Sequence, residues 1–394
     1  MRFIVFLLAF VCAAASTAQT DPVLKTYDRY LKKEIADGQL AGAVAVVVKD
    51  GKVLHRRAYG YSDVENETAM DTGAVFHIMS MTKPVISLAA MMLWEEGKFS
   101  IGAPISNYLA GFENLKVARD VNLGLESPQG AANSVPTIRQ LLSHTAGFSH
   151  GLGGTRLDDE FARAMYFSPH ADLAARVKRM TEFPLVAQPG TRWAYSASPD
   201  VIALLIEKMS GQSVDQFLRE RIFEPLGMHD TGYNMTDTQA ARMPKLYKSV
   251  DGKMVNDPMQ MPASGHTVFG GSHGLLSTAA DYGKFLQMIL DGGVTPAGKR
   301  LVRASTLRIM ARDQTGGVGF TERDDFGYGF AVAKATPADR TDNRGRMSWS
   351  GAYTTFFLVD PAERLYAILL TQTSPYTGRY GETLREHVYR AVLR

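Results

Sequence analysis

Cysteine is almost absent from this chain of 394 residues, since the single one, Cys12, lies close to the start. The first 20 residues have the parts of a secretory signal: Arg2 as a positive n-region, an apolar core at residues 3–15 and a small-x-small site at 16–18. We expect a signal peptide over residues 1–18, cleaved after Ala18, and a periplasmic or secreted mature chain. That chain would contain no thiol, disulfide or cysteine-based metal site. A retained N-terminal anchor is the alternative, although the apolar run is short for a bilayer.

A strong charge of one sign is also lacking. The 43 Lys and Arg residues nearly balance the 40 Asp and Glu residues, and the formal net charge is +3. So small a charge argues against nucleic acid or an anionic membrane as a partner. There is no basic run, internal repeat or low-complexity tract, and a hydrophobic content of 45% fits a soluble enzyme. We expect a small-molecule substrate, no cofactor and no membrane association after cleavage, while the oligomeric state stays open.

Strand and helix patterns differ along the chain. Helical spacing over residues 21–35 is followed by a hairpin, in which strands at 43–48 and 52–59 flank an Asp50-Gly51 turn. Residues 99–264 carry helical patterns and few strand signals. From 265 onward helices at 281–290, 304–311 and 380–393 accompany strands at 328–333, 346–350, 354–359 and 365–371.

These patterns predict a mixed α/β (α+β) fold. The N-terminal hairpin has no sheet of its own, so we expect both chain ends to build one largely antiparallel sheet flanked by helices. The predicted α/β domain comprises residues 19–98 and 265–394, and a mostly helical domain comprises residues 99–264. An active-site cleft is expected between the two.

The strongest chemical signal is the pair Ser80 and Lys83. An apolar run ends at Ser80, and an almost entirely apolar helical pattern follows over residues 82–94 before Gly97. Residues at i and i+3 share one face of a helix, so the Lys83 amine can reach the Ser80 hydroxyl. A serine becomes a good nucleophile when a neighbouring base takes its proton, and a buried lysine with a lowered pKa is such a base. A helix-capping serine beside a solvated lysine is the alternative.

Two further segments supply possible partners. Tyr195 follows the turn at residues 188–190 and precedes a helix; an ammonium nearby would favour its phenolate, which makes it a second candidate base and proton donor. The strand edge from Trp349 to Ala352 contains Gly351 and can direct a backbone N–H at a reacting carbonyl. Each segment by itself has a structural alternative: Tyr195 packed against Trp193, or an ordinary strand end.

Together the three segments resemble the serine β-lactamase-like superfamily, which includes class C β-lactamases, D-alanyl-D-alanine peptidases and family VIII carboxylesterases. The resemblance covers roughly residues 23–390 and includes the stretches 141–148, 188–190, 222–228 and 271–279. It implies a β-lactamase/transpeptidase-like fold. It also implies that Ser80 attacks the acyl carbon and that Lys83 and Tyr195 share the proton transfers. The N–H groups of Ser80 and Ala352 would form the oxyanion hole.

Departures from the class C pattern concern the substrate. Ala197 stands where those enzymes have the Asn of Tyr-x-Asn, and Trp349 stands where they have the Lys of Lys-Thr-Gly. Because both polar contacts to a lactam are lost, we expect Trp349, Ser350, Gly351 and Ala197 to line a less polar substrate site. The pattern is closer to family VIII carboxylesterases. We therefore predict a serine hydrolase acting on small esters through an acyl-enzyme.

Several alternatives remain open. The substrate could instead be a β-lactam or a D-Ala-D-Ala or D-aminoacyl peptide, and the same fold could be a non-catalytic cell-wall-binding module. Two G-x-S-x-G matches, at Ser149 and Ser272, compete for the nucleophile, and for Ser272 a triad with Asp360 and His387 has the right chain order. Neither match lies between a strand and a helix. Histidine pairs 144/150 and 266/273 are weak metal candidates, and we expect no metal.

Overall fold

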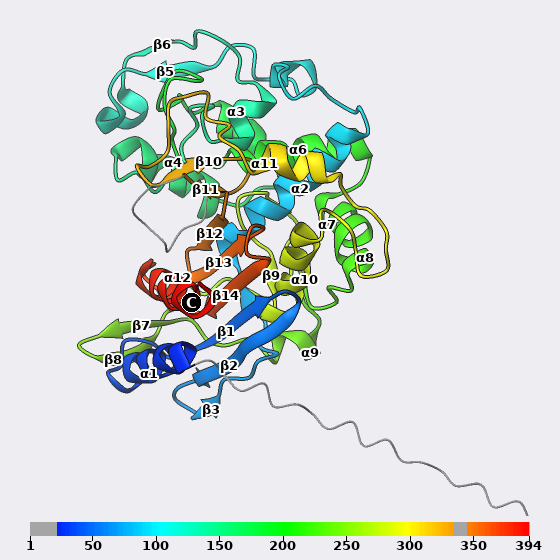
Figure 1. Cartoon of the computed structure of the whole chain (residues 1–394). Coiled ribbons are helices and arrows are strands. Elements are labelled where there is room, and N and C mark those ends of the chain that lie inside the picture. The colour runs from blue at the N-terminus through cyan, green and yellow to red at the C-terminus, as the bar shows by residue number, and fades with distance from the viewer. Residues whose placement is uncertain (1–21, 335–344, 394) are drawn as a thin grey trace, which may run out of the picture.

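The largest element of the computed structural model, which describes residues 22–334 and 345–393, is an eight-stranded sheet (Figure 1). The predicted signal peptide lies outside the described residues. Every strand pairing in this sheet is antiparallel, and the strand order is β10-β11-β12-β13-β14-β1-β2-β3. The strands are β1 Gly42–Lys49, β2 Lys52–Asp63, β3 Thr68–Ala69, β10 Asp324–Phe326, β11 Ala331–Ala333, β12 Met347–Gly351, β13 Thr355–Asp360 and β14 Leu365–Thr371.

Both ends of the chain build this sheet, as predicted. Strand β1 pairs with β14 from Ala43 opposite Thr371 to Lys49 opposite Leu365. The expected hairpin joins β1 to β2, and its turn residues Asp50 and Gly51 have φ values of 51° and 71°. Positive φ at both central positions is typical of a type I′ turn, which suits the twist of the strands. The predicted fold class, an antiparallel sheet flanked by helices, is confirmed.

Alternation along β1 divides the core into two layers. Ala43, Ala45 and Val47 face one side, where they pack with helices α1 (Pro22–Ala36) and α12 (Arg379–Val392). Val44, Val46 and Val48 face the other side and join a larger core. That core also contains α2 (Thr82–Glu95) and α10 (Ala279–Leu290), and α11 (Ala304–Met310) contributes to it. Because α2 is buried on all sides, its apolar composition is needed for packing.

The segment between β5 (Lys116–Ala118) and β7 (Tyr247–Val250) is mainly helical. Its helices are α3 Ile138–Leu142, α4 Arg156–Tyr166, α5 Leu173–Thr181, α6 Ser198–Ser210, α7 Val214–Leu218, α8 Glu224–Leu226 and α9 Asp237–Ala240. Helix α6 packs on α2, and Figure 1 shows this helical part beside the end of the sheet that carries β10 and β11. The boundaries of the two predicted domains stay a prediction.

The sequence patterns missed several short strands. Residues 99–264 contain β5 (Lys116–Ala118), β6 (Gln129–Ala131), β7 (Tyr247–Val250) and β8 (Lys253–Asn256), where few strand signals were found. Strand β7 pairs in parallel with β15 (Thr373–Ser374), so this hairpin adjoins the C-terminal part of the chain. Strand β10 was also missed, and the predicted strand at 328–333 is reduced to β11. Such short strands are stabilised by pairing with distant segments, which local patterns do not reveal.

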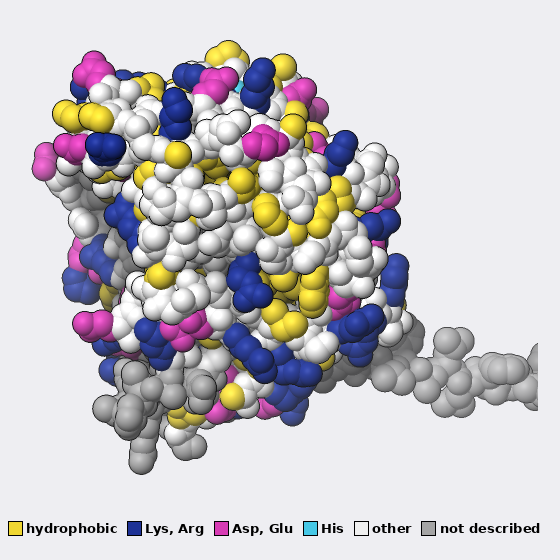
Figure 2. All heavy atoms as spheres, turned by 90° about the horizontal axis from the view of Figure 1, so that it is seen from above, with side chains coloured by type: hydrophobic (Ala, Val, Ile, Leu, Met, Phe, Trp, Pro, Cys, Tyr) yellow, Lys and Arg dark blue, Asp and Glu magenta, His cyan; other side chains and the backbone are white. Residues whose placement is uncertain are grey.

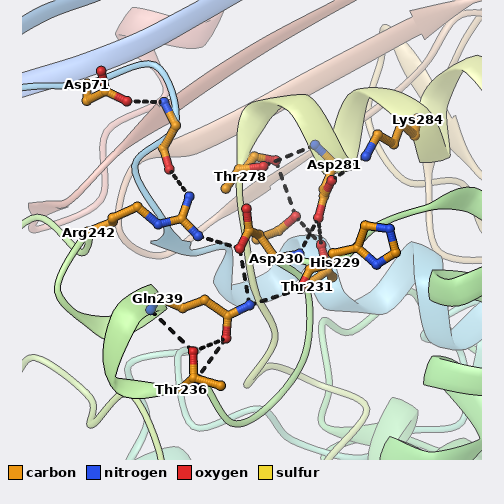
Figure 3. Close-up of polar contacts among 12 residues, drawn as sticks. Asp71, His229, Asp230, Thr231, Thr236, Gln239, Arg242, Thr278, Asp281 and Lys284 are labelled. Carbon is orange, nitrogen blue, oxygen red and sulfur yellow. Dashed lines mark hydrogen bonds and ion pairs between the residues drawn. The ribbon is translucent and has the colours of Figure 1, made fainter.

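A polar cluster anchors the segment that leads into the site (Figure 3). Asp281, at the start of α10, accepts hydrogen bonds from the backbone N–H of Asp230 (2.7 Å) and from Lys284 (2.8 Å). Arg242 pairs with Asp230 and donates to the carbonyl of Gly73 at 2.9 Å. These bonds join the loop before β4 (Phe76–His77) to α10. Strand β4 pairs with β9 (Leu276–Ser277), so the backbone just before Ser80 is held firmly.

The surface carries both signs of charge, and on the face drawn in Figure 2 hydrophobic side chains are exposed among them. In the described part of the chain no helix has the length and apolar character needed to cross a membrane.

Candidate active site

Ser80 lies in a 3₁₀ turn, Met79–Met81, that runs directly into α2. The preceding residue, Met79, has a φ of 50°, a conformation that a side-chain-bearing residue seldom adopts. Strain of this kind persists where the surrounding structure holds it, and it is concentrated at functional sites. The prediction of a helix N-terminus at Ser80 is therefore confirmed, with the added feature of a strained backbone before it.

Lys83 lies one turn further on, with only 1% of its surface exposed. Its Nζ donates a hydrogen bond to Ser80 Oγ at 3.1 Å and another to the carbonyl oxygen of Ser272 at 2.7 Å. Burial lowers the pKa of Lys83 to about 7, with Asp200 opposing and Arg176 adding to this shift. Near neutral pH a large fraction of the amine is therefore unprotonated, as a base acting on Ser80 requires.

The environment of Lys83 depends on an ion pair that the sequence did not reveal. Arg176 Nε lies 3.0 Å from Asp200 Oδ2, and both side chains are largely buried. Asp200 Oδ1 accepts the backbone N–H of Ser272 at 2.7 Å. This bond holds the backbone of Ser272, whose carbonyl oxygen accepts the hydrogen bond from Lys83. Asp200 was noted only as part of the Tyr-Ser-x-x-x-Asp pattern, and nothing in the sequence pointed to Arg176, which lies 24 residues earlier.

Tyr195 lies beside this pair in an aromatic cluster. Its ring centroid is 4.6 Å from Lys83 Nζ, and the ring of His150 stacks on it at 4.7 Å. Burial raises the pKa of Tyr195 above its ordinary value, and interactions with Ser80 and Trp349 offset this only in part. The expectation that an ammonium would favour the phenolate is therefore wrong in direction. Burial dominates this pKa, and Lys83, whose own pKa is about 7, does not counter it.

The third predicted segment forms the end of β12 and approaches Ser80 closely. A Cβ atom on Gly351 would lie 2.4 Å from the carbonyl oxygen of Ile78 and 2.3 Å from Thr355 Oγ1. Only glycine allows the strand this near to the backbone that precedes Ser80. The next residue, Ala352, lines the same cavities as Ser80. This position suits the predicted oxyanion hole formed by the two backbone N–H groups.

Replacing Gly351 by alanine is expected to lower kcat for a Ser80-dependent reaction about 100-fold, the usual effect of misplacing one oxyanion donor. The added methyl group must push β12 away from Ile78 and carry the N–H of Ala352 with it. The matched control is Gly102→Ala, where a Cβ would meet no atom within 4 Å. Steady-state kinetics of both variants check this, and unchanged kcat in Gly351→Ala would contradict the assignment of this strand edge.

Two cavities open at Ser80. We call the first the wide cavity; it has a volume of about 410 Å³ and is lined by Met79, Ser80, His150, Leu152, Tyr166, Phe167, residues 258–261, His273, Ala352 and Tyr353. We call the second the tryptophan cavity; it measures about 300 Å³ and is lined by Ser80, Leu152, Trp193, Tyr195, residues 349–352 and Tyr376. Their rims expose Leu152, Phe167, Met259 and Tyr376, each by at least half of its surface. Both parts of the fold thus contribute to the cleft, as predicted.

The predicted substrate contacts are placed differently from one another. Trp349, Ser350 and Gly351 line the tryptophan cavity, and Ser350 Oγ accepts a hydrogen bond from Tyr376 at 3.0 Å. Ala197 is fully buried and is not among the residues that line either cavity. Its N–H donates to the carbonyl of Ser149, and its carbonyl accepts from Ser272. We therefore correct its role from substrate contact to support beneath the cleft, because α6 begins at the next residue and turns it inward.

The competing serines are both buried and engaged elsewhere. Ser149 Oγ donates to Asp158 at 2.5 Å, and Ser272 Oγ donates to the carbonyl of Ala197 at 3.2 Å. His387 bonds to the carbonyl of Thr383 within α12, on the opposite face of the sheet. The triad suggested for Ser272 is therefore not assembled. The actual role of the Ser272 segment is to hold Lys83 through its backbone.

Three histidines surround the site: His144, His150 and His273. Burial lowers the pKa of each, and Lys83 adds to this, so the rings are neutral near pH 7. His144 bonds to Ser196 at 2.9 Å and contacts the ring of Tyr195, while His150 and His273 line the wide cavity. Among the described residues no group of three or more His, Cys, Asp or Glu side chains is arranged to hold a metal ion.

A serine and a lysine at the start of a buried helix, beside a large antiparallel sheet, define the β-lactamase/transpeptidase class of fold. The family model described as Beta-lactamase matches residues 27–389, and the chain belongs to this family of hydrolases. An uncharacterized protein of Mycobacterium tuberculosis is 31% identical over 361 residues, covering 87% of this chain and 88% of that protein. Esterase EstB of Burkholderia gladioli is 29% identical, covering 96% of each. The solved structure of EstCE1, a hydrolase with promiscuous acyltransferase activity, has a TM-score of 0.78 at 23% identity, covering 93% and 98%, and so shares the fold.

Proposed function

We propose that this protein hydrolyses small carboxylic esters through a covalent acyl-enzyme on Ser80. The observation that carries the proposal is the buried amine of Lys83, 3.1 Å from Ser80 Oγ, with a pKa of about 7. A lysine of this kind removes the proton of a serine without a histidine base. The printed name of the relative EstB, an esterase, is consistent with this choice.

Acylation begins with Lys83 as the base. As Ser80 Oγ attacks the ester carbonyl carbon, its proton passes to the neutral amine of Lys83, and the carbonyl oxygen becomes negatively charged. The backbone N–H groups of Ser80 and Ala352 stabilise that charge. Tyr195, held as a phenol by burial, donates its proton to the departing alkoxide and takes one back from the Lys83 ammonium. The products of this step are the free alcohol and an ester of Ser80.

Deacylation reverses the proton transfers with water as the nucleophile. Water attacks the carbonyl of the Ser80 ester and gives its proton to the neutral Lys83–Tyr195 pair. When the bond to Ser80 Oγ breaks, that oxygen receives a proton, and the carboxylic acid leaves. Because Tyr195 protonates the leaving group, the alcohol belongs in the tryptophan cavity, which Tyr195 lines. The acyl group then belongs in the wide cavity, which Ser80 also lines.

The walls of both cavities favour esters over lactams. Trp349 supplies an apolar surface where a lysine would bind a substrate carboxylate, and Leu152, at 68% exposed, continues this surface at the rim. An ester needs no such cation, whereas a β-lactam or a D-Ala-D-Ala terminus loses its charged contact here. β-Lactam or peptide hydrolysis remains the second candidate, since the family bears the name of that activity.

On one purified sample, kcat/KM for p-nitrophenyl acetate or butyrate is expected to exceed that for nitrocefin at least about tenfold, the value of one missing polar contact. Two absorbance assays under the same conditions measure this, and Ser80→Ala provides the background rate for each substrate. A higher efficiency on nitrocefin would make β-lactam hydrolysis the better assignment. Failure of a fluorophosphonate or a penicillin probe to label Ser80 would favour the non-catalytic binding module.

A further inference from the structure

Beyond the wide cavity lies a third hollow, which we call the histidine cavity. It measures about 270 Å³ and is lined by Met165, Tyr166, Ser168, His170, Arg176, Tyr233, Met261, residues 265–268, His273 and Gly274. Tyr166, Met261 and His273 line both it and the wide cavity, so the two share a wall. An acyl chain that starts at Ser80 and fills the wide cavity therefore ends beside these three residues, which also line the histidine cavity.

The permanent charge in the lining of this cavity is that of Arg176. An arginine and three histidines contribute to the lining, and no acidic side chain is among the described residues that form it. The Arg176 side chain is 8% exposed, and neither its Nε, which lies 3.0 Å from Asp200 Oδ2, nor its Nη2 makes a hydrogen bond in the described part of the chain, both atoms being shielded from solvent. A guanidinium carries five N–H donors, and the ion pair with Asp200 uses the Nε side. Burial makes such an unused donor costly unless a ligand binds it.

Hydrogen bonds within the protein already use some of the side chains that line the histidine cavity, and these are not available to a ligand. His170 and His266 bond through Nε2 to the carbonyl oxygens of Ala164 and Pro262. The ring of His273 makes no hydrogen bond to another described residue. It contacts the ring of Tyr166 edge-on, with 5.3 Å between the two ring centroids. Burial and the charges of Arg176 and Lys83 lower the pKa of His273 to about 3, so its ring is neutral and keeps one N–H donor. Among the arginine and histidines of the lining, Arg176 and His273 are thus the ones that donate no hydrogen bond to another described residue, while Arg176 also pairs with Asp200 and lies over the Tyr166 ring at 5.2 Å.

We propose that the histidine cavity binds a carboxylate at the far end of the acyl group, so that the preferred substrates are monoesters of dicarboxylic acids. A monoanion fits better than a phosphate, because Asp200 already balances part of the Arg176 charge. Asp200 is not among the residues that line the cavity; its Oδ1 accepts the Ser272 N–H, and its Oδ2 lies 3.0 Å from Arg176 Nε. This inference rests on the proposed function, and it assigns a charged subsite to the acyl side of that site.

The test compares two substrates that differ only in this charge: the mono-p-nitrophenyl ester of adipic acid and its methyl ester, which is uncharged. A charge-assisted hydrogen bond in a buried site predicts kcat/KM about 10- to 100-fold higher for the charged ester in the wild-type enzyme. The ratio of kcat/KM for the charged ester to kcat/KM for the uncharged ester should fall to about 1 in Arg176→Met. It should be partly retained in Arg176→Lys. A ratio of 1 or less in the wild type would overturn the proposal.

Two controls separate this subsite from other effects. Arg192→Met removes an exposed cation from a different cavity beside Tyr195 and should leave the ratio unchanged. A ratio that falls equally there would show a general charge effect and refute the subsite. Because Arg176→Met breaks a buried ion pair, His273→Leu serves as a second variant that keeps this ion pair, and in it the ratio should drop at least about threefold.

Failure of the subsite and failure of the proposed function give different results. If neither adipate ester is cleaved but p-nitrophenyl acetate is, the subsite proposal is refuted and the esterase proposal stands. If none of the three esters is cleaved, the esterase proposal is refuted.

Discussion

Replacing Ser80 by alanine is expected to reduce ester hydrolysis at least about a thousandfold and to abolish covalent labelling by a fluorophosphonate. Removal of a nucleophile leaves only the rate that binding and the oxyanion donors supply. In the structure Lys83, the proposed base, lies 3.1 Å from Ser80 Oγ, and Ser80 lines both cavities at the cleft. Initial rates and the intact mass of the labelled protein measure the two effects.

The matched control for this experiment is Ser272→Ala. Ser272 belongs to the rival G-x-S-x-G match, but the contacts that matter are its backbone carbonyl to Lys83 and its N–H to Asp200, and alanine keeps both. The variant loses one hydrogen bond to the carbonyl of Ala197. We expect it to lose about 1 kcal/mol of stability and to retain labelling. Activity that survives in Ser80→Ala and disappears in Ser272→Ala would reverse the assignment.

Lys83 should have the second-largest effect and should set the pH dependence. Lys83→Met removes the base and is expected to lower kcat/KM about a thousandfold, within the range for a general base. Lys83→Arg should be equally poor, because a guanidinium stays protonated and does not accept the serine proton. Rates of ester cleavage with correction for spontaneous hydrolysis provide the measurement. Activity in Lys83→Met within tenfold of the wild type would exclude this lysine as the base.

The sign of the pH effect follows from the lowered pKa of Lys83. The amine acts as a base only when neutral, and its pKa is about 7, so kcat/KM should fall about tenfold per pH unit below that value and level off above it. Tyr195→Phe, which keeps the ring that stacks on His150 and removes the phenol, should lower the plateau yet leave the acidic limb in place. A limb that disappears in this variant would assign the titrating group to Tyr195.

The spacing of residues along the sequence was sufficient to predict much of the fold and the contact between Ser80 and Lys83. The Ser80–Lys83 contact follows from an i, i+3 relation within one helix, and the Asp50-Gly51 turn follows from the conformations that these residues tolerate. The joining of both chain ends in one sheet followed from the lack of any other partner for the N-terminal hairpin. Each of these inferences depends either on interactions between residues close together in the sequence or on the need of every strand edge in the hairpin for a partner.

Other features depend on segments that meet only in the folded chain. The direction of the Tyr195 pKa shift, the burial of Ala197 and the support of Lys83 by Ser272, Asp200 and Arg176 all arise in this way. Desolvation depends on everything packed around a group, and so does the choice of partner for a buried ion. The sequence by itself therefore determined the fold and indicated the candidate residues for the chemistry that this fold presents. Only the tertiary structure decided their protonation states and the shape and charge of the cavities, because both are set by long-range packing.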